Sequence, residues 1–401
     1  MKKQIVICGG GNSAHTLIPL LSKSEFEISV LTSRPNAWSK TLELDYVLPN
    51  GEIAKSIQGS IKLATNDPEK CIPEADYIVL CMPVHKYRVA LHNIAPFINR
   101  NKTVVVGTVY GQGGFNWMVD EIIKKYHLHN IITFAFGLIP WVCRVIEYGH
   151  KGVTYGFKAI NAAAVNPQDK FKQLNDEFFD PICYNWFYVG KTEQAGTFLS
   201  ITLAVDNQII HPTRCYALSQ ENPNGWNSVT DVPMFYRDYD QYSADCLSAL
   251  DDDYSKVRNR LKEMYPDKDW HYMLNYLDLD RYTNQYEPED IVDSFVSSPK
   301  LGAIGTPVVA DDNGNVNIDT NSRFFTDDIY YGICITKWIA EQLDIEVPMI
   351  DNVLRWAQEL RDEQIISDDN HLILDSIDLC APMKSGIPYY YGKTRIEDII
   401  G

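Results

Sequence analysis

The chain has 401 residues, a length that predicts two compact domains because a domain usually takes about 150 residues. Its 36 Lys and Arg against 53 Asp and Glu leave a net charge of −17. That charge argues against nucleic acid or an anionic membrane as the main partner, since both require clustered cations. Hydrophobic residues make up 45% of the chain, enough for buried cores, and no apolar run approaches the ~18 residues of a membrane span.

The cysteines and the first residues predict a cytoplasmic protein. Nine cysteines, odd in number and scattered, indicate reduced thiols and not a disulfide framework. The first apolar run stops at three glycines and is too short for a signal peptide. No Cys or Cys/His cluster has zinc-binding spacing, so we expect no metal.

The first motif is a glycine-rich turn between a strand and a helix. Gln4–Cys8 predicts a buried strand, and an apolar-periodic helix follows from His15. The turn between them has the form GxGxxA, which is typical of dinucleotide binding because its glycines allow a tight turn and a close approach of the pyrophosphate to the backbone. A plain glycine turn is the alternative. The cofactor-binding residues predicted here are Gly9, Gly11, Asn12, Ser13 and Ala14.

The second strand, Ile28–Thr32, bears on which cofactor is bound. An NAD-specific site usually has an acidic residue about 20 residues after the glycine motif. Thr32, Ser33 and Arg34 stand at those positions instead. Hydroxyls and a guanidinium suit a 2′-phosphate, so we expect NAD(P)H and modestly favour NADP(H). Arg34 stacking on adenine, or simply solvated, is the alternative.

Further strands alternate with helices, which predicts a doubly wound parallel sheet in a first domain of residues 1–195. The expected strands are Ala75–Met82, Thr103–Val106 and Ile131–Phe136, with continuation through Gly152–Phe157 and Trp186–Val189. Ligands bind outside the carboxyl ends of such strands. We therefore expect Pro83, Val84 and the 107–114 loop to border a nicotinamide.

The second domain, 196–401, is predicted to be mostly α-helical. A long apolar helix is expected over Phe198–Ile210, followed by acidic, Tyr-rich loops that include Asp251–Asp253. Further helices are expected near Lys256–Met264, 269–283, Asp328–Leu343 and Ile350–Arg361.

Two features of the second domain and one feature of the first domain are candidates for a catalytic or substrate-binding role. Pro212 should end or kink the long helix at His211, leaving an imidazole that could act as an acid/base or could be a satisfied core residue. Arg323 could clamp a carboxylate, and Asp327 or Asp328 could orient the histidine. An exposed helix cap is the plainer interpretation of that segment. Cys143, in the first domain, is expected to line a pocket.

The chain resembles the octopine dehydrogenase (opine dehydrogenase) family over essentially its whole length. The resemblance is carried by CGGGNSAHTL (8–17), IPWVCRVIEYG (139–149), IIHP (209–212), VPMFYRDYDQYSAD (232–245), RFFTDDIYYG (323–332) and WAQE (356–359). It implies an N-terminal Rossmann domain, a helical C-terminal domain and a site in the cleft between them. The implied reaction condenses an α-keto acid, commonly pyruvate, reductively with an amino group, using a nicotinamide cofactor.

The resemblance also implies individual roles. His211 matches the catalytic acid/base, Asp328 its carboxylate partner and Arg323 the clamp for the keto-acid carboxylate. Gln112 is similar to a keto-acid contact, and Cys143 matches a position near the amine pocket.

This chain departs from arginine-using members of the family. They carry an acidic residue just before the LPW-like motif, where this chain has Gly137 and Leu138, and a tyrosine four residues before the histidine, where it has Asn207. A different amine, such as taurine, glycine or alanine, is therefore expected. Asn207 lies one helical turn before His211 and could bind the substrate.

Two other functions stay open. One is a 2- or 3-hydroxy-acid dehydrogenase of the 6-phosphogluconate or ketopantoate reductase type, although those enzymes use a lysine that the 198–210 segment lacks. The other is a nicotinamide-binding protein without catalysis. We expect small-molecule partners only, no nucleic acid or membrane, and a monomer or homodimer.

Overall fold

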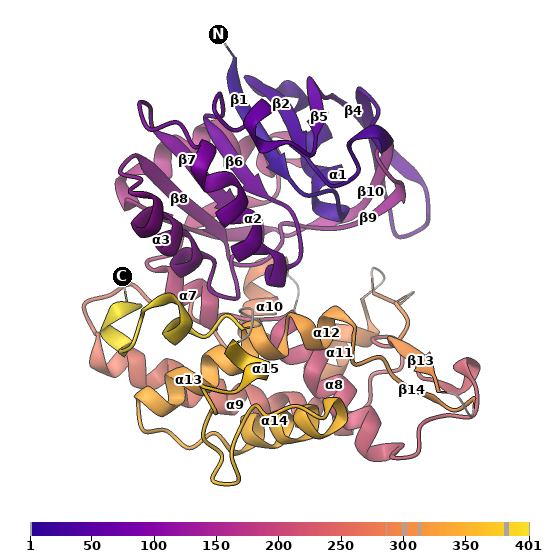
Figure 1. Ribbon diagram of the computed structural model, residues 1–401. Helices are drawn as coiled ribbons and strands as arrows, with labels where there is room; N and C mark the ends of the chain where they lie inside the picture. Colours follow the sequence, from indigo (N-terminus) through magenta and orange to yellow (C-terminus); the bar gives the residue numbers. More distant parts are fainter. Residues whose placement is uncertain are drawn as a thin grey trace. The chain divides into compact units, whose positions relative to one another are not determined.

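The computed structural model describes residues 2–285, 287–298, 301–302, 304–311, 314–380 and 385–400. The chain divides into two compact units (Figure 1). The first takes its described residues from 1–111, 115–202 and 283–285, and the second from 112–114, 203–282 and 286–401. The loop 112–114, expected at the edge of the sheet, thus belongs to the second unit.

An eight-stranded sheet forms the centre of the first unit, in the order β12-β11-β8-β7-β6-β1-β2-β5. The neighbouring pairs from β8 to β5 are parallel, and β11 runs antiparallel to β8. This confirms the predicted α/β fold with a parallel sheet. Its strands are β1 (Lys3–Cys8), β2 (Phe26–Leu31), β5 (Leu63–Thr65), β6 (Tyr77–Leu80), β7 (Val104–Thr108), β8 (Ile131–Phe136), β11 (Ile160–Asn166) and β12 (Lys191–Gln194).

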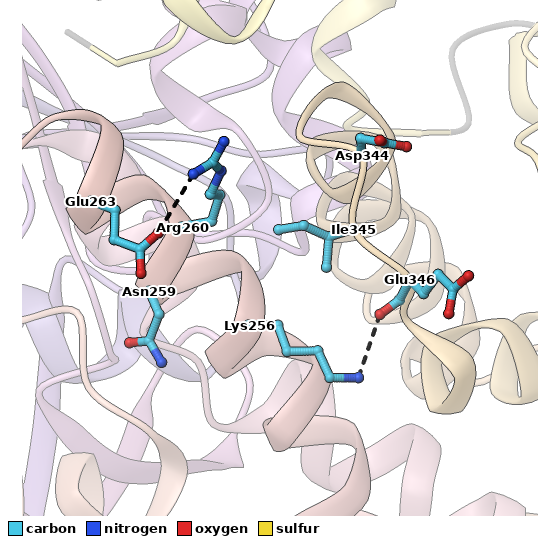
Figure 2. A pocket seen from close by; sticks show the side chains of 7 residues that line it. All are labelled: Lys256, Asn259, Arg260, Glu263, Asp344, Ile345 and Glu346. Carbon is cyan, nitrogen blue, oxygen red and sulfur yellow. Dashed lines mark hydrogen bonds and ion pairs between the residues drawn. The ribbon is translucent and has the colours of Figure 1, made fainter.

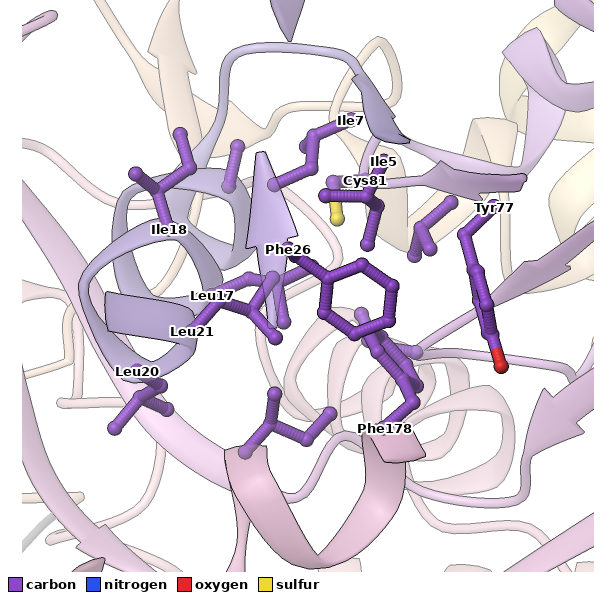
Figure 3. Close-up of a cluster of buried hydrophobic side chains, with 14 of the residues drawn as sticks. Ile5, Ile7, Leu17, Ile18, Leu20, Leu21, Phe26, Tyr77, Cys81 and Phe178 are labelled. Atoms are coloured by element: carbon purple, nitrogen blue, oxygen red, sulfur yellow. The ribbon is translucent and has the colours of Figure 1, made fainter. Parts of the chain in front are cut away.

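Both faces of this sheet are buried, as a doubly wound sheet requires. Ile5 and Ile7 of β1 pack into a cluster with Leu17 of α1 (Asn12–Leu20) and with Phe178, as Figure 3 shows. Because side chains alternate along a strand, the equally buried Val6 and Cys8 point to the other face. The remaining longer helices of this unit are α2 (Tyr87–Ile94) and α3 (Phe115–Tyr126).

The pairing aligns the carboxyl ends of four neighbouring strands. Cys8 at the end of β1 pairs with Leu31 of β2 and with Leu80 of β6, and Leu80 pairs with Thr108 of β7. The segments that follow these strands therefore leave the sheet at one edge, where ligands bind in this class of fold.

A second sheet, in the order β4-β3-β10-β9, corrects the prediction that Gly152–Phe157 extends the main sheet. Those residues lie in β10 (Lys151–Phe157), which pairs with β9 (Trp141–Glu147) and with β3 (Thr41–Val47). β4 (Ile53–Ser60) completes the sheet. Since β10 follows β9 by a short turn, it pairs with its hairpin partner and not with the main sheet.

The strand expected over Trp186–Val189 is also wrong. Tyr184–Phe187 form a short helix, α6, which ends at Tyr188 in the left-handed conformation (φ +57°). α6 is the last of several short helical segments over Phe171–Phe187. Aromatic side chains from these segments, such as Phe178 and Phe179, lie in the hydrophobic core of the unit. An apolar run of this length fits a buried helix as well as a strand.

The second unit is mostly helical, as predicted. Its longest helix, α9 (Gln241–Met264), includes the Asp251–Asp253 run that was expected to be a loop. Burial explains the difference: Asp251 accepts a hydrogen bond from Arg258, and Asp253 accepts the first backbone N–H groups of α14. The other elements are α7 (Phe198–Leu203), which begins in the first unit, α8 (Asn207–Glu221), α10 (Tyr276–Asn284), α11 (Ile291–Val296), α12 (Arg323–Thr326), α13 (Cys334–Gln342), α14 (Pro348–Arg361), α15 (Ile377–Cys380), β13 (Val308–Ala310) and β14 (Val316–Ile318).

Among the described residues, no helix has the length and apolar character needed to cross a bilayer.

Candidate active site

His211 lies inside helix α8 and not at a helix end, which corrects the prediction for Phe198–Ile210. The expected single helix breaks before Asn207, because the Asp206 side chain accepts the Asn207 N–H at 2.5 Å and caps a new helix there. Pro212 lies within α8, which continues to Glu221. Proline gives up one helical hydrogen bond here. Burial of most residues from Gln208 to Leu218 holds the helix in place.

The His211 imidazole forms a buried pair with a carboxyl group 117 residues away. Its Nδ1 lies 2.7 Å from Oδ2 of Asp328, and its Nε2 lies 3.0 Å from the hydroxyl of Tyr236. Phe324 stacks on the ring at 3.7 Å between centroids. Both ring nitrogens are thus bonded, and one ring face is covered by an aromatic side chain.

Burial sets the protonation of this pair. Removal from water lowers the pKa of His211 well below its ordinary value, and the charge of Arg323 lowers it further. Burial likewise raises the pKa of the Asp328 carboxyl, partly opposed by Arg323. Both shifts favour the uncharged form of the group concerned, because neither charge would be solvated by water. The imidazole is therefore a neutral base held in one orientation.

Arg323 brings an exposed positive charge close to the pair. It is the first residue of α12, and its guanidinium lies 5.4 Å from the ring centroid of Phe324, the residue that stacks on His211. Within the described part of the chain it forms no ion pair. A guanidinium in this position can bind a carboxylate bidentately.

A π-helical turn follows Asp328 and joins α12 to α13. It spans Ile329–Ile333. Its carbonyl at Tyr331 accepts the side-chain amide of Gln208, one residue after Asn207 on α8. A Cβ on Gly332 would lie 2.9 Å from the Gln208 side chain. This close approach brings Asp328 to His211, and π-turns are frequent at functional sites.

Gln112 and Asn207, both predicted to bind substrate, lie in the same unit as His211. Gln112 is fully buried and donates to the Ala204 carbonyl at 3.1 Å, just before α8 begins. Asn207 is half-buried in the first turn of α8. The contribution of either residue to substrate binding stays a prediction.

The glycine-rich turn of the first unit has the geometry that a dinucleotide requires. Gly9 has φ +123°, and a Cβ there would lie 2.2 Å from the Cys81 carbonyl oxygen. A Cβ on Gly11 would meet nothing within 4 Å, so the missing side chain leaves open space. Helix α1 begins at the exposed Asn12, with no acidic residue in its first turn and with N–H groups available to an anion.

The remaining predicted cofactor residues lie at the same edge of the sheet. Thr32, Ser33 and Arg34 follow β2, and the latter two are exposed. The exposed Pro83 and the buried Val84 follow β6. The structure therefore groups these predicted residues with the glycine-rich turn, while their contacts with a cofactor stay a prediction.

Cys143 lies in β9 with its side chain 5% exposed, within the hydrophobic core of the first unit. Burial raises the pKa of its thiol to about 11. It is therefore a protonated core thiol, unsuited to act as a nucleophile. Its expected proximity to an amine pocket stays a prediction.

Sequence reasoning singled out neither Tyr236 nor His15. Tyr236 lies within VPMFYRDYDQYSAD, which carried the family resemblance, but no local pattern linked its hydroxyl to a histidine 25 residues earlier. His15 directly follows the GxGxxA motif, and it bonds to the turn at Gly11.

An open groove of about 540 Å³ lies elsewhere in the second unit, between α9 and the loop that follows α13 (Figure 2). No predicted site residue lines it. Its charges are mostly neutralised locally, as by the Arg260–Glu263 ion pair. The lining residues are Lys256, Asn259, Arg260, Glu263, Asp344, Ile345 and Glu346.

Two family descriptions match different parts of the chain. Residues 194–361 match "NAD/NADP octopine/nopaline dehydrogenase, alpha-helical domain", and residues 4–110 match "NADP oxidoreductase coenzyme F420-dependent". The first match includes His211, Tyr236, Arg323 and Asp328, and the second includes the glycine-rich turn.

Individual relatives match over nearly the whole chain. Octopine dehydrogenase of Mizuhopecten yessoensis is 27% identical over 383 residues, covering 90% of each chain. Tauropine dehydrogenase of Arabella iricolor is 25% identical, covering 99% of each chain. A solved structure of octopine dehydrogenase with NADH and L-arginine has a TM-score of 0.82 at 23% identity, covering 99% of this chain and 98% of that one. This last similarity shows a shared fold.

The lowered pKa of His211 predicts that its ring keeps one protonation state between pH 8 and pH 6. The ring is neutral there because an imidazolium would have to form away from water. Imidazole ¹⁵N and ¹³C resonances followed by NMR would check this, with the exposed His129 in the same spectra for comparison. A titration midpoint of His211 at or above 6.5 would contradict the assignment.

Proposed function

We propose that this chain, which is similar to the octopine dehydrogenase family, is an opine dehydrogenase-like oxidoreductase. It condenses an α-keto acid, pyruvate by our expectation, with the amino group of an amino acid or related amine, using NAD(P)H, in a reversible reaction. The observation that carries the proposal is the buried His211–Asp328 pair with the exposed charge of Arg323 beside it. The relatives named octopine and tauropine dehydrogenase support it.

The residues of the glycine-rich turn fit a dinucleotide. Gly9 and Gly11 leave the backbone accessible, and the first turn of α1 offers N–H groups to a pyrophosphate. Thr32, Ser33 and Arg34 would lie toward the adenosine end, and Pro83 with Val84 toward the nicotinamide. When bound, the nicotinamide supplies or accepts the hydride.

Arg323 is assigned to the carboxylate of the keto acid. Its guanidinium is exposed and can form two parallel hydrogen bonds with a carboxylate. Gln112 is assigned as a second contact with the keto acid. Fixing the acid in this way orients its carbonyl carbon, and such positioning provides a large part of the rate enhancement in reactions of two substrates.

His211 is assigned as the acid/base. In the reverse direction it removes a proton from the secondary amine, which frees the nitrogen lone pair before the hydride leaves. In the synthetic direction it returns that proton to the amine nitrogen after hydride transfer to the C=N bond. Asp328 holds the imidazole through Nδ1. The Tyr236 hydroxyl, bonded to Nε2, can both accept and donate and so continues the proton path that begins at Asp328.

The amine is proposed to be other than arginine. The positions where arginine-using members carry an acidic residue and a tyrosine hold Gly137 or Leu138 and Asn207 here. Gly137 and Leu138 are buried and offer no negative charge to a guanidinium. The candidates are taurine, glycine, alanine or another amino acid.

A cytoplasmic location is also proposed. All nine cysteines are free thiols, and eight of them are buried. Buried thiols of this kind are typical of proteins in a reducing compartment.

The reaction is tested by NAD(P)H oxidation with pyruvate and a panel of amines. We expect oxidation only when both are present, and a His211→Ala variant should lose about 10²- to 10⁴-fold in kcat because it lacks the acid/base. Its Kd for NAD(P)H should stay within twofold of that of the unchanged protein. Exposed His371 gives the control His371→Ala. Oxidation of NAD(P)H with the keto acid alone would indicate a hydroxy-acid dehydrogenase. No oxidation with any pair of keto acid and amine would indicate a nicotinamide-binding protein without catalysis.

Replacing Arg323 should affect the keto acid selectively. Hydrogen bonds to charged groups contribute about 1.5–3 kcal/mol, so Arg323→Gln should raise the KM for the keto acid about 10- to 100-fold. The KM for the amine should change much less. Arg260→Gln, at an exposed arginine of the same unit, is the matched control. Equal increases for both substrates would remove Arg323 from its assigned role.

Replacing Arg34 should distinguish the two cofactors. An Arg34→Asp variant should bind NADPH at least about tenfold more weakly, because a carboxylate would repel the 2′-phosphate. Its affinity for NADH should change little. Fluorescence titration with each cofactor would measure both values, and an equal loss for the two would show that Arg34 does not contact the 2′-phosphate.

A further inference from the structure

Strand β9 and the turn that follows it are hydrogen-bonded to the first residues of α1, although they belong to the second sheet of the first unit. The Gly149 N–H donates to His15 Nε2 at 2.7 Å, and His15 Nδ1 donates to the Gly11 carbonyl at 2.9 Å. Asn12 Oδ1 accepts the Val145 N–H at 2.9 Å. Two of these hydrogen bonds thus join residues that are more than 130 positions apart, and the third holds His15 to Gly11.

His15 serves as the link between the two turns. Only the tautomer with a proton on Nδ1 satisfies both of its bonds, because Gly11 offers a carbonyl and Gly149 an N–H. The ring is fully buried. Gly149 has φ +80°, and a Cβ there would lie 1.9 Å from the Ala37 carbonyl oxygen, so this turn has little freedom to shift.

The linked turn places Tyr148 at the end of β2. Its hydroxyl lies 3.2 Å from Thr32 Oγ1, and a Cβ on Gly10 would lie 2.4 Å from that hydroxyl. The guanidinium carbon of Arg34 lies 3.7 Å from the centre of the Tyr148 ring. Trp38 packs against Tyr148 edge-on. One aromatic ring therefore contacts both the glycine-rich turn and the arginine assigned to the adenosine end.

We propose that Tyr148 is a specificity-determining residue of the cofactor site: its ring orients Arg34 to bind the 2′-phosphate of NADP(H). His15 is the residue that positions Tyr148. The inference rests on the proposed function. Arginine loses side-chain freedom when it binds a phosphate, and stacking on an aromatic face beforehand reduces that loss. The hydroxyls of Tyr148, Thr32 and Ser33 add donors near the same group. NADH lacks the 2′-phosphate and gains nothing from this arrangement.

The test measures binding and needs no turnover. Isothermal titration with NADPH, NADH and adenosine 2′,5′-bisphosphate is applied to the unchanged protein and to Tyr148→Leu, which removes the stack. We expect the Kd for NADPH and for the bisphosphate to rise about two- to fivefold or more, with a smaller change for NADH. Tyr148→Phe keeps the stacked ring but lacks the hydroxyl, so its Kd for NADPH should lie between those of the unchanged protein and Tyr148→Leu. Tyr188→Leu, at an exposed tyrosine of the same unit, is the matched control.

A second variant tests the positioning role. His15→Ala should reduce the preference for NADPH as Tyr148→Leu does, and the double variant should show no further loss, because both changes release the same side chain. Circular dichroism confirms that each variant is folded.

Two outcomes would overturn the inference. Equal loss of NADPH and NADH affinity in Tyr148→Leu, or no loss of either, would show that Tyr148 does not serve the 2′-phosphate. Additive losses in the double variant would overturn the role of His15. If the unchanged protein binds neither cofactor, the proposed function itself fails, which separates the two failures.

Discussion

The hydrogen bond between His211 and Asp328 is the interaction on which the second unit depends most. A buried polar group left without a hydrogen-bonding partner costs about 1–3 kcal/mol, so each of these two buried groups requires the other. The pair therefore persists only if α8 and the segment after α12 meet closely. Gly332 against Gln208, and the Gln208 amide on the Tyr331 carbonyl, provide that contact. The same contact between α8 and the segment after α12 thus packs this unit and places the Asp328 carboxyl beside the His211 imidazole.

In the first unit the corresponding constraint is the alignment of parallel strand ends. Cys8, Leu31, Leu80 and Thr108 lie in register, so short segments that are distant in sequence share one edge. The second sheet adds residues that the main sheet does not provide, since β9 and the turn after it bond to Asn12 and His15 of α1. A nucleotide at this edge would meet residues from both sheets.

The sequence predicted the parts of the structure that local patterns determine. The turn from Gly9 to Ala14 is one, because a positive φ and a close approach restrict the residue types. Long-range pairing was not predictable in this way: β4 has mostly exposed residues, so its membership of a second sheet depends on β3. The break before Asn207 depended on one cap at Asp206. The residues alone offered Asp327 or Asp328 as the partner of His211, and the family resemblance selected Asp328, which the structure pairs with it. Tyr236 was missed because no spacing rule connects it to His211.

The π-helical turn after Asp328 has a consequence for how this segment tolerates change in length. An α-helix turns about 100° per residue, so deleting one residue from Ile329–Ile333 would let a regular helix run on into α13. That smoother backbone would swing the Asp328 carboxyl around the helix axis and away from the imidazole. The π-helical turn thus fixes the direction in which the Asp328 side chain points relative to α13. Insertions or deletions in this turn should therefore be tolerated far less well than most substitutions.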